Sequence, residues 1–552
     1  MSHYTYNPSY PHSMKEEFLP CSQQPPLASV PMDGRGNFSN QSGRPVKLCK
    51  ANLIRQIIRY SYWLGEDASG VHFLVPYHSG PVLMVEADMI APVIKQIVAD
   101  YGNRDVSDQS IRDALDIIRR DQAHHVGVGN GRTWLGENNE RYIILDGVVM
   151  MFPVGKEYMI QPNQYYNYWQ PTNCRPFQKL NHGAASQDIK AIDKFVQLPK
   201  DRELLIYSYI LLCLMPERQQ LALEITGEPK SGMARLQRII KHLVDPVTKE
   251  TAIREIPTTV KEVNRLAWRH HVLSLESVAS PLSPVVQRRL FELLSHTQLE
   301  WKAIGCHEIT TSLSVSRPCI ISSLEPVIHQ DELSELTLSL EMPSPSRDQP
   351  RIEYPKTTRS VSITDSNQAV IFDAVLTLLG EVHTKIDHVS IDRSVPVCWG
   401  DFCRIGMVVS SVLHGSPDAF WSQYVAYRSE RLAEITEEEP IAQAILEYLK
   451  INDITEIAEK PVGVWLATLD PYRPTWALDH QWPREPRGLG AAFKRAAQLL
   501  DAQGITCYST GKRGSKRHWV IGPRSVPCGI ALSNRLASSI VNKEVNEFAG
   551  LM

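Results

Sequence analysis

The sequence predicts a multidomain α/β protein, and three observations support this fold class. The chain has 552 residues, 43% of them hydrophobic and 22% charged, which is typical of a globular protein with about three or four domains. A glycine-spaced turn at 227–234 lies between a strand-like and a helix-like run, as in a phosphate-binding P-loop. Helices and two strands around a basic turn near the C-terminus have the order of a winged helix. We therefore expect an N-terminal α/β region, a P-loop central domain, a helical segment and a C-terminal winged helix.

Charge, hydropathy and cysteine spacing limit the possible functions. A net charge of −3 gives no general attraction to nucleic acid, so a nucleic-acid site must come from local clustering of basic residues. The longest apolar run, 204–215, is too short to cross a bilayer, and the N-terminus lacks the pattern of a secretory signal. The ten cysteines form no C-x-x-C pair, and no third ligand accompanies His124 and His125. We expect a cytoplasmic protein with no metal, no cofactor and no membrane partner.

The chain begins with a polar tail and a small α/β domain. Residues 1–46 are rich in proline and polar residues, which predicts disorder. Residues 47–185 form the predicted N-terminal α/β domain. Its hydrophobic periodicity predicts helices at 51–64, 89–101 and 108–121 and strands at 72–76, 81–85, 141–149 and 157–160. The aromatic stretch 161–176 is interpreted as a packed connection, with a base-stacking surface as the alternative.

The turn in the predicted P-loop domain (186–342) has the spacing of a P-loop without its reactive groups. Its two glycines, Gly227 and Gly232, fit the pattern G-x-x-x-x-G-K-[ST], but Met233 replaces the lysine and Ala234 replaces the hydroxyl residue. A thioether carries no charge and a methyl group cannot coordinate Mg²⁺, so nucleotide phosphates would lack both partners.

Two further features of this domain bear on nucleotide binding. Lys230 lies inside the turn and could swing toward a phosphate, which leaves weak nucleotide binding open. The strand-like run 271–275 ends at Glu276. A strand that ends in an acidic residue is typical of a Walker B element, in which the acid holds Mg²⁺. Further strands at 318–323 and 338–340 would complete the sheet, the first of them placing a polar residue beside the γ-phosphate.

Beyond a proline-containing linker at 343–364 the chain is predicted to be helical. The helical domain, 365–435, has helices at 367–382, 403–414 and 416–432. In the predicted winged helix, 436–524, Thr436 and the glutamates after it are interpreted as a capping box. Its helices are expected at 440–450, 454–458 and 486–503, and its strands at 505–509 and 518–521, followed by a short tail at 525–552.

Basic residues are concentrated in the last part of this winged helix. Residues 484–524 contain nine Lys or Arg and only two acidic residues. A basic helix followed by a basic β-turn is typical of a domain that binds the DNA backbone, whereas a solvated hairpin is the simpler alternative. The predicted DNA-binding residues are Arg487, Lys494, Arg495, Lys512, Arg513, Lys516 and Arg517.

Several stretches together resemble a known family. They are 226–236 (TGEPKSGMARL), 243–246 (LVDP), 273–277 (LSLES), 317–325 (RPCIISSLE) and 482–490 (WPREPRGLG). The family comprises ATP-binding P-loop proteins of phages and other bacterial mobile elements, often described as primase- or helicase-like, and the resemblance covers about residues 50–522. It implies an AAA+-like central domain.

The resemblance also identifies where this chain departs from the family. Besides the lysine and hydroxyl positions, the family has aspartate where this chain has Glu276, a sensor asparagine at Ser322, and an arginine at Leu336. Together these changes remove the charge clamp, the metal ligand and the transition-state stabiliser, which carry most of phosphoryl-transfer catalysis. The comparison implies a degenerate nucleotide site rather than an ATPase.

Three functions follow from these features. The first is a catalytically degenerate P-loop protein of a phage or mobile element that binds DNA through its winged helix, in replication or its control. The second is an active ATPase or helicase-like replication protein with an unorthodox site, completed by a partner ATPase or by a homo-oligomer. The third is a scaffold, such as a host-directed phage factor. The basic cluster favours the first over the third, and the substituted turn favours it over the second.

Overall fold

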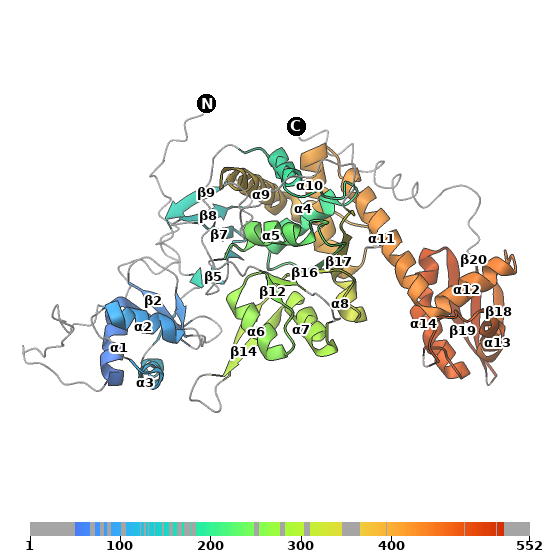
Figure 1. Cartoon of the computed structure of the whole chain (residues 1–552), viewed down its shortest axis with the longest axis horizontal. Helices are drawn as coiled ribbons and strands as arrows, with labels where there is room; N and C mark the ends of the chain where they lie inside the picture. Colours follow the sequence, from blue (N-terminus) through green and yellow to red (C-terminus); the bar gives the residue numbers. More distant parts are fainter. Residues whose placement is uncertain are drawn as a thin grey trace, which may run out of the picture. The chain divides into compact units, whose positions relative to one another are not determined.

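A computed structural model describes most of the chain between residues 50 and 523 (Figure 1). The described residues are 50–66, 72–77, 82–85, 90–100, 106–121, 123–125, 129–130, 132–136, 138–145, 148–153, 158–162, 168–169, 177, 184–247, 253–276, 282–302, 310–344, 365–392, 395–479, 481–514 and 516–523. Both predicted tails and most of the predicted linker lie outside them. The chain divides into an N-terminal unit, Met1–Gln423, and a C-terminal unit, Tyr424–Met552. No helix of the described residues has the length and apolar character needed to cross a membrane.

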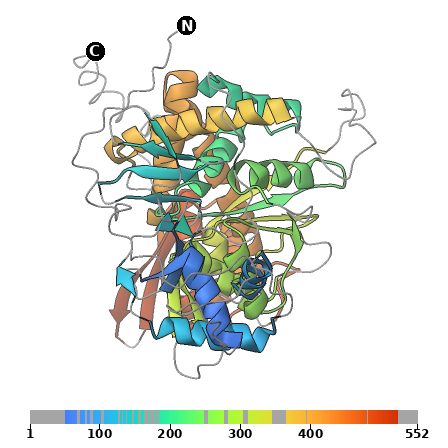
Figure 2. The ribbon, with the colours of Figure 1, turned by 90° about the vertical axis from the view of Figure 1, so that its left-hand side faces the viewer.

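The N-terminal unit begins with three helices against a small sheet (Figure 2). The helices are α1 (Lys50–Ser61), α2 (Ile90–Asp100) and α3 (Asp108–Arg119), and the strands are β1 (Tyr62–Glu66), β2 (His72–Pro76), β3 (Leu83–Met84) and β4 (His124–His125), in the order β3-β2-β1-β4. The predicted helix 51–64 is too long, because the chain from Tyr62 pairs with β2 as an antiparallel strand. Ile54, Ile57 and Ile58 of α1 pack into the core of this region.

A second sheet in this unit is an antiparallel meander. It consists of β6 (Thr133–Leu135), β7 (Arg141–Ile144), β8 (Val148–Phe152) and β9 (Met159–Pro162). The single strand predicted at 141–149 is wrong, since β7 and β8 form a hairpin. All four residues of β7 are buried, so the strand lacks the alternation of buried and exposed residues that would help to show where it ends. The Asp-Gly sequence at 146–147 is nevertheless common in hairpins. Two-residue strands β5 (Gly129–Asn130) and β10 (Tyr168–Trp169) pair with each other, and the rest of the aromatic stretch 163–176 lies outside the described residues.

The centre of the N-terminal unit is a parallel five-stranded sheet in the order β12-β13-β16-β11-β17. Its strands are β11 (Ala222–Thr226), β12 (Arg254–Glu255), β13 (Leu273–Glu276), β16 (Cys319–Ser323) and β17 (Thr337–Glu341). Helix α5 (Met233–Val244) lies on one side of the sheet, and α6 (Val260–Arg269) and α7 (Pro284–Leu294) lie on the other (Figure 1). Right-handed crossovers require this division. From β11 the chain crosses the sheet to the edge strand β12, and from β12 it returns in the opposite direction through β13 and β16, so the connecting helices lie on opposite faces. The predicted strand–turn–helix arrangement and the later strands are therefore confirmed.

The remaining elements of this unit surround the sheet. They are the 3-10 helices η4 (Ser186–Lys194), η5 (Ile386–His388) and η6 (Val397–Trp399), the helices α4 (Glu203–Cys213), α8 (Asp331–Glu335), α9 (Asp365–Lys385) and α10 (Gly400–His414), and the hairpin β14 (Thr297–Lys302) with β15 (Thr310–Val315). Helix α4 is apolar nearly all round and buried from Leu204 onward, as the run 204–215 predicted, because it packs against α5, α9 and α10.

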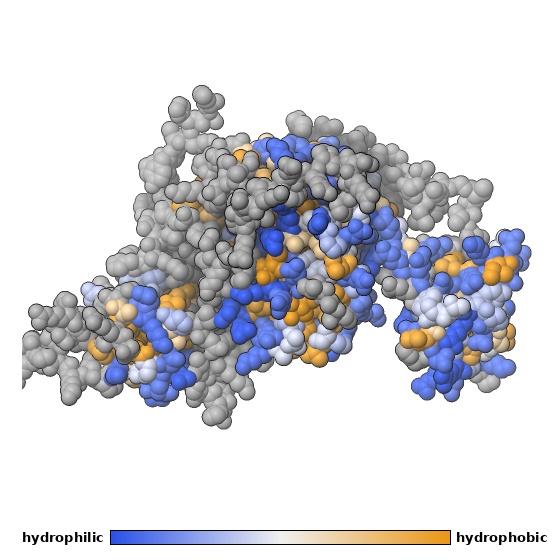
Figure 3. All heavy atoms as spheres, in the orientation of Figure 1, coloured by the Kyte–Doolittle hydropathy of each residue, from blue (hydrophilic) through white to orange (hydrophobic). Residues whose placement is uncertain are grey.

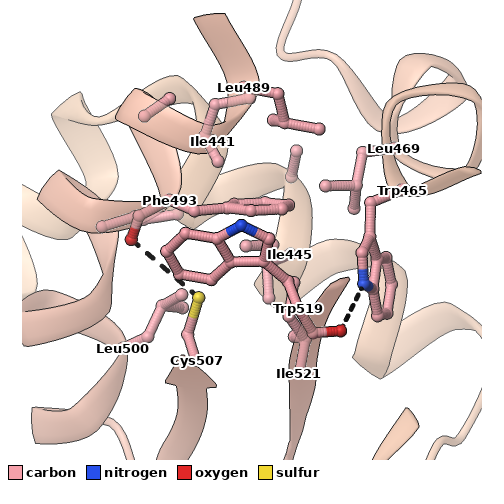
Figure 4. Close-up of a cluster of buried hydrophobic side chains, with 14 of the residues drawn as sticks. Ile441, Ile445, Trp465, Leu469, Leu489, Phe493, Leu500, Cys507, Trp519 and Ile521 are labelled. Atoms are coloured by element: carbon pink, nitrogen blue, oxygen red, sulfur yellow. Dashed lines mark hydrogen bonds between the residues drawn. The ribbon is translucent and has the colours of Figure 1, made fainter. Parts of the chain in front are cut away.

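The C-terminal unit packs three helices against one three-stranded sheet. Besides the greater part of α11 (Asp418–Glu438), its helices are α12 (Pro440–Ile451), α13 (Val462–Leu469) and α14 (Pro486–Ala502), with the 3-10 turn η7 (Asp470–Tyr472). Its strands are β18 (Ala458–Pro461), β19 (Ile505–Arg513) and β20 (Lys516–Pro523), in the order β18-β20-β19. Figure 4 shows the core, where Trp519 lies against Phe493 and the Trp465 indole N–H donates to the Trp519 carbonyl over 3.0 Å. Figure 3 shows polar and apolar residues interspersed on the visible face of this unit.

Two boundary predictions in this region are wrong. Residues 436–438 form the last turn of the long helix α11 (Asp418–Glu438) instead of opening the next one. The residue that caps α12 is Glu439, whose carboxylate accepts from the backbone N–H groups of Ile441 (2.7 Å) and Ala442 (3.0 Å). The predicted helix 454–458 is absent from the described residues, because the chain there leads into β18, which pairs with β20.

Candidate functional site

The glycine-spaced turn lies at the carboxyl edge of the central sheet, between β11 and α5. Gly232 caps α5 with φ of 100°, and Lys230 also has a left-handed φ, of 76°. A Cβ atom on Gly232 would lie 3.2 Å from Val196 Cγ2, and one on Gly227 would lie 2.8 Å from Ser231 Oγ and 3.2 Å from Met342 Cβ. Conformation and close packing thus explain why both positions are glycine. The shape of the turn thus depends on its two glycines, whatever the chemistry of its other side chains.

The side chains of the turn provide little for a phosphate. Lys230 is exposed, and its backbone conformation is one that an L-residue adopts at a cost of about 1–2 kcal/mol. Met233 and Ala234 begin α5 and are half-buried. Neither side chain can form an ion pair with a phosphate or coordinate Mg²⁺, which prefers oxygen ligands. The lysine inside the turn is therefore the one cation of the turn itself.

Beneath the turn, the predicted sensor Ser322 belongs to a buried polar network. Its hydroxyl donates to the Gln237 side-chain oxygen over 2.6 Å. The Gln237 amide nitrogen donates to Ser274 Oγ (3.0 Å) and to the Leu275 carbonyl (2.8 Å). These bonds tie α5 to β13 and β16 inside the domain. Ser322 thus helps to hold α5 to the sheet through Gln237. The sequence did not predict this contact.

Two further predicted site residues lie at opposite edges of the sheet. Glu276 ends β13 at the carboxyl edge, is exposed, and stands in register with Ser322. Leu336 precedes β17 at the amino edge, where its carbonyl accepts from the Ala222 N–H over 2.9 Å, and it is buried. The two edges are separated by a strand of about 15 Å. Leu336 therefore cannot belong to the nucleotide site of its own chain, which corrects the prediction.

A buried charge cluster follows α5, and no feature of the sequence predicted it. The Asp245 carboxylate pairs with Lys241 and, over 2.7 Å, with Arg132 Nε, and all three side chains are at most 1% exposed. It also accepts from the backbone N–H groups of His271 (2.8 Å) and Val272 (3.1 Å). Burial by itself would raise the pKa of Asp245, but the two cations outweigh it and hold the pKa well below its usual range.

The histidines beside this cluster are neutral. Burial lowers the pKa of His270 to about 3, with a further contribution from Lys241. Burial lowers the pKa of His271 to about 4, with a further contribution from Arg317. His271 Nε2 lies 2.8 Å from the Cys213 carbonyl. The cluster therefore joins the β6–β7 segment, α5 and β13 by charge without offering a titrating group near neutral pH.

In the C-terminal unit, α14 separates its side chains into a buried and a basic face. Leu489, Ala492, Phe493, Ala496 and Leu500 lie in the core. Arg487, Lys494 and Arg495 are exposed. The structure thus places the predicted helix residues on the solvent side of α14, where a partner could reach them.

The ends of β19 and β20 form a second basic element, the basic hairpin (residues 511–517). Its predicted residues Lys512, Arg513, Lys516 and Arg517 are all exposed, and Gly511 (φ 98°) and Gly514 (φ 64°) allow the left-handed backbone there. The strands pair Lys512 with Arg517 and Arg513 with Lys516, so like charges stand directly opposite each other. Such pairs are destabilising unless an opposite charge lies near them.

Two acidic residues from other elements reduce the net charge of these basic residues. Glu439 Oε1 lies 3.7 Å from Arg495, and Glu459 Oε2 lies 3.0 Å from Arg513. Within the described residues the other five have no carboxylate within ion-pair distance: Arg487, Lys494, Lys512, Lys516 and Arg517. No sequence spacing could reveal these pairs, because each joins separate elements.

Comparison with known proteins gives one family match. Residues 441–529 match the AICE RepA C-terminal domain. This range runs from the second residue of α12 to beyond the end of β20 and therefore contains all seven predicted DNA-binding residues. No curated protein matches the chain.

Solved structures show weaker likenesses. The SCCmec type IV Cch active helicase is 10% identical, with a TM-score of 0.43 over 90% of this chain and 98% of that one. The apo C-terminal region of NrS-1 is 10% identical, with a TM-score of 0.33 over 84% and 96%. The Orc1 protein of Aeropyrum pernix, solved in complex with DNA, is 14% identical, with a TM-score of 0.18 over 67% and 98%. All three TM-scores are below 0.5, so these likenesses are weak.

Proposed function

We propose that this chain is a replication protein of a mobile genetic element that binds DNA through its C-terminal unit. The observation that carries the proposal is the exposed basic surface of α14 and the basic hairpin, inside the range that matches a RepA C-terminal domain. The order of α12, β18, α13, α14, β19 and β20 supports a winged helix, in which α14 would be the reading helix and the basic hairpin the wing. Cations of this kind bind chiefly to phosphates.

The P-loop-shaped turn is proposed to have no ATPase activity. Met233 and Ala234 supply neither charge nor a ligand for Mg²⁺, and Ser322 is bonded to Gln237. Catalysis of phosphoryl transfer depends on positioned charges, so the turn is a structural link between β11 and α5.

The alternative, an active ATPase with an unorthodox site, makes a different prediction. Full-length protein is expected to show no Mg²⁺-dependent ATP hydrolysis above a heat-inactivated sample, with or without DNA. Met233→Lys combined with Ala234→Ser restores the missing charge and hydroxyl, and is expected to raise ATP affinity in an equilibrium titration. Steady turnover by the unaltered protein that disappears in Gly232→Val would support the ATPase instead.

DNA binding is tested with two neighbouring cations of α14. Lys494 has no carboxylate partner in the described residues, whereas Arg495 is already paired with Glu439. In fluorescence anisotropy with duplex DNA, Lys494→Ala is expected to lower affinity roughly five- to tenfold at 0.1 M salt, the contribution of one phosphate contact. Arg495→Ala is the matched control and should cost clearly less, because its charge is partly neutralised. Equal affinities for both variants and the unaltered protein would argue for the scaffold function.

A further inference from the structure

We propose that the basic hairpin contacts DNA with one face only, the face that carries Lys512 and Arg517, while Arg513 and Lys516 point to the other side. This inference rests on the proposed DNA binding and specifies which side chains perform it. The four cations are adjacent in the sequence and all exposed, so composition alone treats them as equivalent.

Strand alternation assigns the two faces. Trp519 and Ile521 of β20 point into the core with α14, so Arg517, two residues before Trp519, points to the same side. His518 and Lys516 point to the opposite side by the same alternation. Residues directly opposite each other in an antiparallel pair share a face, which places Lys512 with Arg517 and Arg513 with Lys516. The irregularity between Ser509 and Gly511 does not change this, because these two pairs lie beyond it.

Contacts of Glu459 on β18 confirm the outer face independently. Glu459 stands in register with Val520, whereas its neighbour Lys460 stands in register with Trp519 and lies 4.7 Å from the Trp465 ring centroid, on the core side. Glu459 therefore points outward. Its carboxylate pairs with Arg513 and accepts from Thr510 Oγ1 over 2.6 Å. Arg513 is thus held on the outer face, and a phosphate approaching there would have to compete with a carboxylate.

The inner face is the one that can share a duplex with α14. Phe493 of α14 lies 5.1 Å from Trp519 between ring centroids, and a Cβ atom on Gly490 would lie 4.0 Å from the Trp519 indole nitrogen. The chain turns back at Gly504, so β19 runs opposite to α14 and the hairpin tip lies toward the start of the helix. Arg487 is exposed at that end. Lys512 and Arg517 therefore flank the start of α14, and one DNA backbone can meet all three.

Two double variants with the same charge change test this arrangement in the full-length chain. Lys512→Ala with Arg517→Ala is expected to reduce the magnitude of the slope of log affinity against log salt by about 1.8, and to weaken duplex binding roughly thirty- to a hundredfold at 0.1 M salt. Arg513→Ala with Lys516→Ala should change the slope by less than about 0.5. Circular dichroism checks that both variants are folded.

Equal losses in the two variants, or a larger loss in the second, would overturn the one-sided contact. Such a result would mean that the cations on both faces of the hairpin contribute to DNA binding. A failure of the unaltered protein to bind DNA is a different outcome, because it would contradict the proposed function itself.

Discussion

Replacing Asp245 with asparagine is expected to lower the free energy of unfolding of the central domain by about 3–5 kcal/mol. Asparagine keeps the shape of the side chain but removes the charge that Lys241 and Arg132 share inside the protein. Both cations would remain buried after losing this carboxylate, Arg132 beside the Pro246 carbonyl and Lys241 beside the Val272 carbonyl and His270. Breaking a buried ion pair costs more than the pair contributes, because the charge left behind has lost its solvation.

Hydrogen exchange of the α5 and β13 amides in increasing urea measures this loss of stability at the site itself. Unfolding of other parts of the chain then does not contribute to the measured value. Asp108→Asn serves as the matched control, because Asp108 pairs with Lys95 over 2.6 Å at a site where both side chains are about half exposed. That exposed pair is screened by solvent and should contribute little to stability. A loss for Asp245→Asn as small as for the control would show that the cluster does not hold the domain together.

Local patterns predicted much of the fold. The apolar run before Gly227, the glycine spacing and the amphipathic run after it defined β11, the turn and α5, because each signal lies within a few residues. The ends of elements were predicted wrongly where contacts with distant residues determine them. Tyr62 fits the apolar periodicity of α1, yet its pairing with Pro76 makes it a strand residue. Likewise Thr436 has the sequence of a cap, but α11 continues through it.

The sites were harder to predict, because their decisive contacts are not local. Arg132 meets Asp245 across 113 residues of sequence. Glu459 reaches Arg513 from a different strand, so a count of basic residues overestimated the free charge of the hairpin. The family resemblance located Ser322, but only the structure shows that Gln237 binds its hydroxyl. Residue types thus predicted which groups could act, and packing determined which are available.

Removing the four cations on the α14 side is expected to have the largest effect on DNA binding. Arg487, Lys494, Lys512 and Arg517 are exposed, have no carboxylate partner within the described residues, and lie on elements packed against one core. If each meets one phosphate, replacing all four with alanine should weaken duplex binding roughly a thousandfold at 0.1 M salt. All four side chains are exposed, so the fold should persist, and the urea unfolding midpoint checks this. If the quadruple variant binds duplex DNA with an affinity within threefold of that of the unaltered protein, the C-terminal unit is not the DNA-binding element.

The most direct test of the central claim is the salt dependence of duplex binding by the unaltered full-length protein, measured by anisotropy with and without Mg²⁺ and ATP. The proposed function predicts tight binding at low salt and a log–log slope of about −3.6 or steeper, since four phosphate contacts each contribute about 0.9. It also predicts the same curve in the presence of nucleotide. No binding at low salt, or a slope near zero, would contradict a phosphate-binding basic surface, and affinity that requires ATP would show that the P-loop-shaped turn still works as a nucleotide site.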